Sequence, residues 1–464
     1  MAALASATTT APASAVVPRV PIPAKGVDYR NKIVLAPMVR SGELPSRLLA
    51  LKYGADLVWG PETIDKSMIG TERRVNPRNG VIEYTRMPSN GGRTQAPVKE
   101  SIIYRIDPVR EQNRLIFQMG TSNPELAVQA ARVVAADVSG IDVNSGCPKP
   151  FSTHAGMGAA LLRTPDLLVS ILEALVKEVG EPFQIGISVK IRILSDPEET
   201  KKLVSRLVKT GITGLTVHCR TTPMRPRERA IRDQLRMVAG ICHDAGVACV
   251  MNGDVTSRDQ GLALMAEYGV DGAMIATSAE TNSSCFRAEA DGGLASWQEI
   301  VYEYMKICLE QENRMANTKY LLNMLIPGKN KEFKYATLSK TYLDLCRALK
   351  LEDLLPAAER VDQLLGLDEK WASPPGAPGA TDIPAKPETK SKAVQNAMES
   401  ESARAAGGGA ARTKASAPVA HAGGPIRRTS APKAAKVAKV EAEQPAVETT
   451  NPATQTQAQS QVTA

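Results

Sequence analysis

The chain has 464 residues, of which 43% are apolar, so it is long enough for one large domain with appended segments. The net charge is +8, yet residues 28–370 carry 44 basic and 42 acidic side chains, and most of the excess lies in the terminal segments. A nucleic-acid contact on the folded part would therefore be a local basic patch. No run approaches the ~20 apolar residues that a membrane span requires, so we expect no membrane partner.

The seven cysteines show no C-x-x-C pair and no disulfide-like spacing. Their odd number and the lack of a secretory leader favour a reducing compartment, and we expect a cytoplasmic or nuclear protein. Residues 2–26 are rich in Ala, Ser, Thr and Pro, which leaves mitochondrial targeting open, although a disordered arm over 1–27 is favoured. Cys242, His243 and Cys249 lack a fourth ligand nearby, so no metal site is predicted.

Eight short β-branched runs follow one another between residues 33 and 276, and helical patterns separate them. Asn123 and Thr164 each precede a Pro-acid pair that is typical of a helix start. Apolar strands that alternate with helices indicate a parallel sheet buried on both faces, and eight such strands close a (β/α)8 barrel. An open doubly wound sheet is the alternative, but no G-x-G-x-x-G follows the first run. The runs are 33–36, 56–59, 115–119, 140–144, 187–191, 214–218, 247–252 and 272–276.

The composition of the residues outside these runs indicates an insertion and two further segments. Residues 70–109 are rich in Arg, Pro, Gly and Asn and are expected to lie over the barrel mouth. From residue 296 apolar side chains recur at helical spacing, and from residue 373 nearly all large apolar residues disappear. We therefore predict an α/β fold, a (β/α)8 barrel followed by a small all-α helical domain, with disordered N- and C-terminal tails. The bounds are 1–27 for the arm, 28–292 for the barrel, 293–370 for the helical domain and 371–464 for the tail.

The predicted strand ends carry polar side chains of a particular kind. In such a barrel, functional side chains project from the carboxyl ends of the strands. Lys190 and His218 lie there with the amides of Gln118 and Asn252, a set that suits a flat, polar heterocycle. Gly253 lets the backbone approach a phosphate, and flavin mononucleotide (FMN) fits best, since a cation stabilises the reduced ring. The alternative is an ordinary salt bridge and a core histidine.

The fourth run ends in a turn that carries Cys147. Gly146 and Pro148 flank this cysteine, so the backbone turns sharply where the strand ends and the thiol is left open. A buried structural cysteine is the alternative, because free cysteine packs as a small hydrophobe.

Several segments are distinctive: LAPMVRSGELPSRLLALKYGADLVW, FQMG, GIDVNSGCPKPFSTHAGMGAALLRTPD, ISVKIR, LTVHCRTTPMRPRE and NGD. With them, residues 31–370 resemble the tRNA-dihydrouridine synthases, especially the fungal branch that acts on uridine 20 of the D loop. The resemblance implies an FMN-binding barrel, a helical tRNA-binding domain and NADPH as the electron donor. It also implies hydride transfer from flavin N5 to C6 of uracil, with Cys147 as the proton donor to C5.

The resemblance assigns roles to individual positions. Asn144 would bind the base, which must be flipped out of the folded tRNA. The FMN positions are Pro37, Met38, Val39, Glu62, Gln118, Lys190, His218, Asn252, Gly253, Asp254, Ala276 and Thr277. The residues expected to bind substrate are Asn144, Lys149, Arg192, Arg220, Arg225 and Arg227.

Two departures and one basic loop bear on tRNA binding. Thr277 stands where many family members carry arginine, and the double-stranded-RNA-binding domain of animal relatives has no counterpart in the tail. Residues 404–439 hold eight basic residues and no acidic one, which suits either a phosphate contact or a solvated linker. The loop 220–232 carries five arginines and is expected to contact tRNA rather than to be a merely solvated face.

Two other functions compete with this hypothesis. An FMN-dependent dihydroorotate or dihydropyrimidine dehydrogenase would use similar chemistry, but would not need the arginine loop or the helical domain. A non-catalytic tRNA-binding chaperone would not need Cys147, Lys190 and His218 together.

Overall fold

The computed structural model describes residues 19–87, 100–225 and 227–367. Its main sheet has the order β2-β1-β12-β11-β10-β9-β8-β7-β3, and an additional β2–β7 pairing closes it into a barrel. Each of the eight predicted runs is a strand of this barrel, with no end displaced by more than one residue, so the predicted (β/α)8 barrel is confirmed. The strands are β1 (Lys32–Leu35), β2 (Leu57–Trp59), β7 (Leu115–Gly120), β8 (Gly140–Ser145), β9 (Gly186–Arg192), β10 (Gly214–His218), β11 (Ala248–Asn252) and β12 (Gly272–Ile275), with the short β3 (Thr63–Ile64) beside β7.

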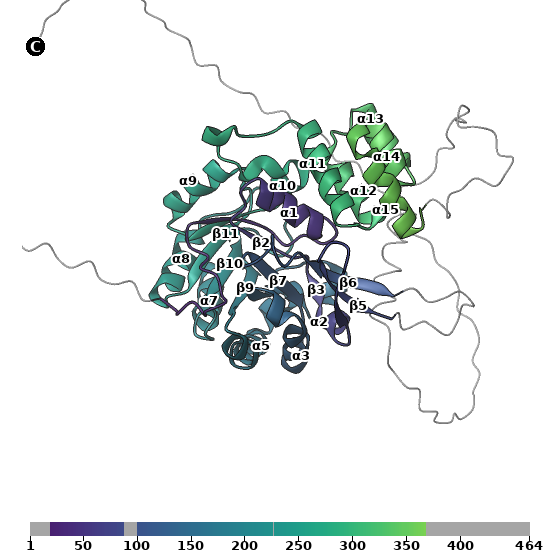
Figure 1. Ribbon diagram of the computed structural model, residues 1–464. Helices are drawn as coiled ribbons and strands as arrows, with labels where there is room; N and C mark the ends of the chain where they lie inside the picture. Colours follow the sequence, from purple (N-terminus) through teal and green to yellow (C-terminus); the bar gives the residue numbers. More distant parts are fainter. Residues whose placement is uncertain (1–18, 88–99, 226, 368–464) are drawn as a thin grey trace, which may run out of the picture. The chain divides into compact units, whose positions relative to one another are not determined.

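Helices cover the outside of the barrel (Figure 1). The Asn123 side chain accepts a hydrogen bond from the Leu126 amide and caps α3 (Pro124–Val134), as its sequence predicts. Gly269 ends α9 (Arg258–Tyr268) in the left-handed conformation. The other helices of this part are α1 (Leu44–Lys52), α2 (Asp65–Met68), α4 (Pro150–Thr153), α5 (Pro165–Leu175), α6 (Glu181–Phe183), α7 (Pro197–Leu207), α8 (Leu235–Asp244) and α10 (Thr277–Thr281).

The barrel interior is apolar at its amino-terminal end. Tyr29 and Trp59 are fully buried there, with ring centroids 5.6 Å apart, and they pack with side chains of β1, β7, β11 and β12. A separate, larger core lies between the outside of the strands and the helices. The lower interior is thus filled, and the polar side chains predicted for the site lie above it, toward the carboxyl ends of the strands.

The described part of the insertion at residues 70–109 does not lie over the mouth, although the composition of the segment predicts that position. It contains an antiparallel sheet, and Arg73 pairs with Asp137 at 2.6 Å while the Tyr84 hydroxyl also donates to Asp137. Asp137 precedes β8, so this contact lies at the amino-terminal end of the barrel strands, away from the mouth. Residues 88–99 lie outside the described residues. The sheet consists of β4 (Glu72–Val75), β5 (Ile82–Arg86) and β6 (Ser101–Ile106).

The disordered arm was predicted to extend to residue 27, but its last residues are ordered in the structure. The Val20 amide donates to the Gly246 carbonyl and the Lys25 amide to the Gln184 carbonyl, so residues 19–27 lie against the barrel. Composition suggests disorder here because the segment supplies few large apolar residues, yet backbone hydrogen bonds to the barrel order it. Residues 1–18 lie outside the described part of the chain.

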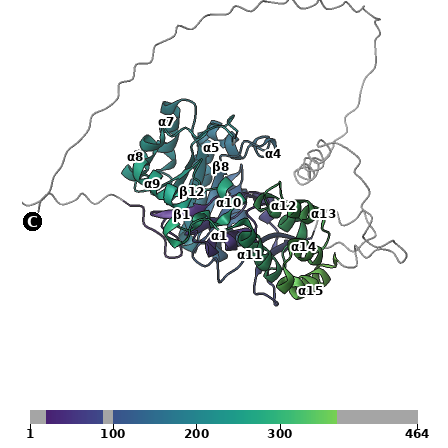
Figure 2. The same cartoon turned by 90° about the horizontal axis from the view of Figure 1, so that it is seen from above.

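Five helices follow the barrel and lie together (Figure 2). They share a hydrophobic core with α1, and Lys52 of α1 pairs with Glu303 at 2.7 Å. The Arg78–Glu312 pair likewise joins the insertion to this helical group. These helices are α11 (Trp297–Glu310), α12 (Met315–Leu325), α13 (Lys331–Leu338), α14 (Tyr342–Leu349) and α15 (Leu355–Leu365).

Several predictions lie beyond what the structure tests. The tail 371–464, with its basic stretch, lies outside the described residues, and 28–292 and 293–370 stay proposed domain bounds. Within the described ranges, no helix is both long and apolar enough to cross a membrane. In those same ranges, no cluster of three or more His, Cys, Asp or Glu side chains could hold a metal ion.

Candidate active site

Strand register brings the predicted polar side chains to one end of the barrel. Lys190 of β9 is paired with Asn144 of β8, and His218 of β10 is paired with Asn252 of β11. Across β9 and β10, Lys190 is paired with Thr216 and Arg192 with His218, so the pair His218–Asn252 lies two residues nearer the carboxyl end of the strands than the pair Asn144–Lys190. Gln118 of β7 lies one step lower, opposite Asp142 of β8.

The turn after β8 holds Cys147 in a defined position. Asn144 Oδ1 accepts hydrogen bonds from the amides of Gly146, at 2.9 Å, and Cys147, at 3.1 Å, which is the Asx-turn arrangement. Arg192 Nε donates to the Gly146 carbonyl at 2.7 Å, and its Nη1 donates to the Thr221 carbonyl. The cysteine is partly exposed while the other six are buried, so a purely structural role for Cys147 does not fit.

Gly158 is required for this arrangement. Its φ is +59°, and a Cβ there would lie 2.6 Å from the Cys147 carbonyl oxygen and 3.0 Å from the Cys147 Cβ. The next residue, Ala159, donates its amide to that same carbonyl. A side chain at position 158 would therefore displace the turn that carries Cys147.

A buried carboxylate orients Gln118. Asp142 accepts from Gln118 Nε2 at 2.8 Å and from Ser188 Oγ at 2.7 Å, and burial raises its pKa to about 6. Gln118 Nε2 gives one of its two hydrogens to Asp142, so its second N–H and its carbonyl oxygen are left for a ligand. Asp142 was not among the residues predicted for the site.

Lys190 is a half-buried cation of the site. Its Nζ donates to Asn252 Oδ1 at 2.9 Å, and Asn252 Nδ2 donates to the Met274 carbonyl, which fixes the amide. Burial, and then the neighbouring Arg192, lower the pKa of Lys190 to about 8. An anionic ligand beside this ammonium would restore its charge.

His218 is a neutral imidazole. Burial, followed by the charges of Lys190, Arg192 and Arg220, lowers its pKa to about 2. Arg220 Nη1 lies 3.2 Å from His218 Nε2, and because a guanidinium only donates, Nε2 is the acceptor. The proton of the imidazole is therefore on Nδ1.

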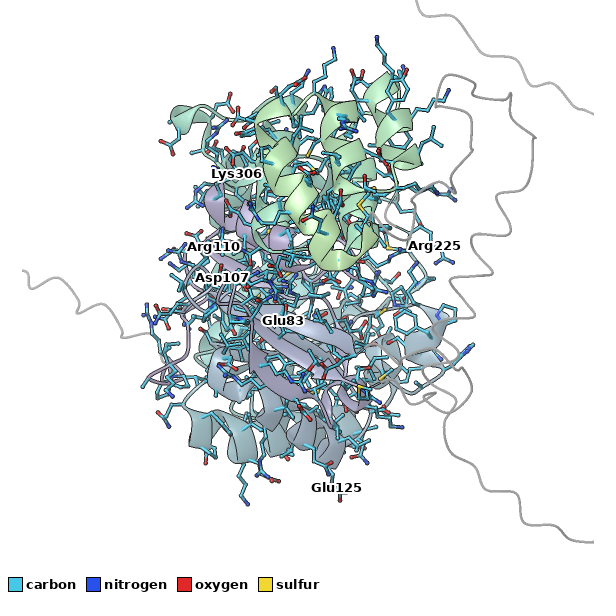
Figure 3. The ribbon with its side chains drawn as sticks, turned by 45° about the vertical axis from the view of Figure 1, so that its right-hand side comes forward. Glu83, Asp107, Arg110, Glu125, Arg225 and Lys306 are labelled. Carbon is cyan, nitrogen blue, oxygen red and sulfur yellow. The ribbon has the colours of Figure 1, made fainter. Side chains whose placement is uncertain are left out.

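The expected arginine contacts divide into buried and exposed groups. Arg220 is 5% exposed and pairs with Asp254, and Arg192 is 8% exposed, so neither lies open on the surface as a phosphate contact would. Arg225 and Arg227 are exposed, and Figure 3 shows Arg225 at the edge of the molecule. Lys149, next to the Cys147 turn, is exposed as well.

Pro37, Met38, Val39, Ala276 and Thr277, also predicted for the site, lie in the segments that follow β1 and β12. Pro37 and Met38 are half-buried after β1, whereas Val39 is 53% exposed. Ala276 and the exposed Thr277 join β12 to α10. The Ser41 hydroxyl donates to Glu280 at 2.5 Å, which ties the loop after β1 to α10.

The comparisons with known proteins agree with this geometry. Residues 34–341 match the family model described as dihydrouridine synthase (Dus). The chain belongs to the dihydrouridine synthase family. A relative from Schizosaccharomyces pombe, named tRNA-dihydrouridine(20) synthase with NAD(P)+ in its name, is 51% identical over 331 residues, 70% of this chain and 66% of that protein. The matched region thus spans about two thirds of that relative's length.

Two further relatives separate the branches of the dihydrouridine synthase family. The Saccharomyces cerevisiae protein with the same name is 45% identical over 70% of this chain and 84% of its own length. A second S. pombe protein, named for positions 20a and 20b, is 28% identical over 54% of this chain and 68% of its own length. Similarity is therefore greater to the proteins named for position 20.

The donor set of this dihydrouridine synthase fold fits FMN. Lys190 supplies a cation, Gln118 a carbonyl acceptor, and His218 a neutral Nδ1–H donor. Gly253 has φ +121°, and a Cβ there would lie 3.1 Å from the Ala230 Cβ and 3.4 Å from His218 Cδ2. A glycine suits this position because φ is positive and the side chains of Ala230 and His218 pack closely against it.

Sequence reasoning missed three supporting residues: Asp142, Gly158 and Arg232. Arg232 donates to the carbonyls of Gly253 and Asp254, and Asp254 in turn accepts from the Ala230 amide at 2.6 Å. The alternating pattern of β8 places Asp142 on the same face as Asn144, which was the available signal. For Arg232 no local pattern distinguished it from the other arginines of its loop.

Proposed function

We propose that this chain is a tRNA-dihydrouridine(20) synthase that reduces the C5=C6 bond of uridine 20 in the tRNA D loop, with FMN as cofactor and NADPH as electron donor. The observation that carries the proposal is the partly exposed Cys147 thiol, held by Asn144 and Arg192 at the same end of the barrel as Lys190. The names of the 51% and 45% identical relatives support the position of the uridine.

The residues proposed to hold FMN divide by the part of the cofactor that they suit. Gln118, Lys190 and Asn252 suit the polar edge of the ring, while His218, Gly253 and the segment at Ala276 suit the phosphate side. Bound flavin, once reduced, supplies the hydride for C6. The Lys190 ammonium stabilises negative charge beside it, because a preorganised cation in a buried site needs no rearrangement during reaction.

Cys147 is the proposed acid for C5. Burial, and then the neighbouring Glu62, raise the pKa of its thiol, so the sulfur carries its proton at neutral pH. A proton donor is needed there because negative charge develops at C5 as C6 is reduced. Asn144 holds the Cys147 amide and so fixes the thiol relative to the base.

The proposed tRNA contacts are the exposed basic residues. Arg225, Arg227 and Lys149 are open to phosphates and sugars near the flipped base. The helical domain is proposed to bind tRNA as well, and Lys331 and Lys334 on α13 are exposed. Arg220 and Arg192 are buried, and they stabilise the loops of the site by bonding to Asp254 and to the Gly146 and Thr221 carbonyls.

The test is mass spectrometry of D-loop fragments from unmodified tRNA after incubation with the purified chain and NADPH. We expect a gain of about 2 Da at position 20, from the two hydrogens added to the C5=C6 bond. Flavin-loaded protein that oxidises NADPH but reduces only free orotate or uracil would identify a small-molecule dehydrogenase. Protein that binds tRNA without flavin would support the chaperone alternative.

A further inference from the structure

A short turn after β1 connects the barrel interior with the helical group. Met38 packs against the buried cluster of the barrel interior, as does Ala276 after β12. The Gly42 amide donates to the Met38 carbonyl at 2.7 Å, and this hydrogen bond closes the turn. A Cβ at position 42 would lie 2.6 Å from that carbonyl oxygen, so the closed turn requires glycine.

Arg40 lies inside this turn in an unfavourable backbone conformation. Its φ is +73°, in the left-handed region that a residue with a Cβ enters at a cost. Such a conformation persists only where surrounding contacts hold it. Two of these contacts are the hydrogen bond of Gly42 and the bond between the Ser41 hydroxyl and Glu280 of α10. Ser41 is fully buried, so the backbone on the carboxyl side of Arg40 is fixed to the barrel.

A further contact of the turn comes from the helical group. The Arg40 guanidinium carbon lies 4.5 Å from the centroid of the Tyr320 ring on α12, within the range of a cation–π interaction. Both side chains are half-buried, so water screens their attraction less than it would on an open surface. α12 packs on α10, and Figure 2 shows the two helices as neighbours. The turn is therefore held by the barrel at Ser41 and by the helical group at Arg40.

We propose that Arg40 is a positioning residue for the cofactor, and that its contact with Tyr320 holds the turn after β1 in the conformation that receives FMN. Pro37, Met38 and Val39 directly precede Arg40, so a change at Arg40 moves residues that are predicted to line the cofactor site. The inference rests on the proposed function, in which FMN binds at this end of the barrel. It gives the helical group a second role, which is to support the flavin site as well as to bind tRNA.

FMN affinity is the property that depends on this contact. Without the Tyr320 ring, the left-handed conformation of Arg40 loses one of the contacts that hold it, and the turn populates other conformations. FMN then binds only the fraction of molecules in the competent conformation, which lowers its apparent affinity by that fraction. A cation–π contact outside the deep core corresponds to a change of about threefold in such a population.

The first test is titration of the full-length chain, freed of flavin, with FMN, followed by quenching of flavin fluorescence. Tyr320→Leu and Arg40→Met should each raise the Kd for FMN about threefold, whereas Tyr320→Phe keeps the ring and should bind like the wild type. The Arg40→Met, Tyr320→Leu double variant should bind no more weakly than either single variant, because both remove the same contact. An unchanged Kd, or single effects that add in the double variant, would overturn the inference.

Lys52→Met is the matched control for this titration. Lys52 of α1 pairs with Glu303 of α11 at 2.7 Å, so this variant also removes a contact of one cation between the barrel and the helical group. Lys52 lies at the other end of α1 from the turn, and its replacement should leave the Kd for FMN unchanged. Circular dichroism checks the fold of each variant before titration. A rise in Kd as large as in Tyr320→Leu would assign the effect to general loosening between the two parts and would contradict a role of the turn.

Activity measurements separate this inference from the proposed function. At saturating FMN, Tyr320→Leu should form dihydrouridine with the wild-type kcat and KM for tRNA, because the contact acts only on cofactor binding. A KM for tRNA that stays raised at saturating FMN would assign Tyr320 to a tRNA contact and overturn the inference. If the wild type binds FMN but forms no dihydrouridine, the proposed function fails, while a threefold rise in Kd still supports the role of Arg40. A wild type that binds no FMN would overturn both.

Discussion

Cys147 combines partial exposure with a thiol that keeps its proton, which is the combination that a proton donor needs. The buried cysteines have the second property without the first: burial raises the pKa of Cys219 and Cys285 to about 12. Exposure of Cys147 arises from the turn that Asn144 holds, and not from its own residue type.

Replacing Cys147 tests this assignment. Cys147→Ala should keep flavin and oxidise NADPH normally, because no cofactor contact is removed, but dihydrouridine formation should fall about 10²–10⁴-fold. Flavin absorbance, NADPH oxidation and mass spectrometry of tRNA measure the three properties. Wild-type turnover in this variant would remove Cys147 from the mechanism.

Lys190 predicts a pH dependence of flavin binding. Burial lowers its pKa to about 8, so the ammonium is charged below pH 8 and becomes neutral as the pH rises above it. Because Lys190 is proposed to hold the polar edge of the flavin ring, affinity for flavin should decrease above pH 8, as measured by retention of flavin during dialysis at a series of pH values. Lys190→Met should bind flavin weakly with little pH dependence between 7 and 9; the same decline in that variant would assign it to another group.

The loop from Arg220 to Arg232 has two kinds of arginine. Arg220 and Arg232 are bonded to Asp254 and to the backbone at Gly253, so they shape the rim, whereas Arg225 and Arg227 are exposed. As an element, the loop therefore joins the cofactor side of the site to the proposed tRNA side.

Reversing the two exposed charges of this loop separates its functions. The Arg225→Glu, Arg227→Glu double variant should raise the KM for tRNA and reduce the salt dependence of tRNA binding by about two phosphate contacts. Flavin content should not change. The matched control is the Lys201→Glu, Lys202→Glu double variant, which reverses two exposed charges on α7. If the KM for tRNA rises equally in this control, the effect of the loop variant is explained by net charge alone.

At the scale of the whole molecule, a buried ion pair connects the first helix with the insertion. Arg47 of α1 pairs with Glu111 at 2.6 Å, and Arg47 also donates to the Arg105 carbonyl of β6. Arg105 in turn donates to the Gln311 carbonyl after α11. Figure 3 shows Asp107 and Arg110 of the adjoining segment next to each other; the Asp107 carboxylate is buried and the Arg110 side chain is exposed.

Removing one partner of the buried pair should destabilise the protein more than removing both. Glu111→Gln leaves Arg47 with an uncompensated buried charge and should cost about 3–5 kcal/mol in unfolding free energy, whereas Arg47→Met with Glu111→Leu should recover part of that loss. Urea denaturation followed by circular dichroism measures both. A double variant no more stable than Glu111→Gln would mean that the other hydrogen bonds of Arg47 dominate.

Local pattern was sufficient for the framework of this protein. The strand runs and the Asn123 cap depend on residues within a few positions, and the structure agrees with each. The turn at Cys147 was predicted from Gly146 and Pro148, but the hydrogen bonds that hold it come from Asn144 and Arg192, and Gly146 does not have a positive φ.

Local residue patterns specify the barrel and the polar ends of its strands, since alternation and capping are local. Which of those side chains meet depends on the fold, which turns the Gln118 amide toward Asp142 and buries Arg220 on Asp254. These contacts join residues 24 and 34 positions apart, and they depend on strand register and barrel closure, which no single segment encodes.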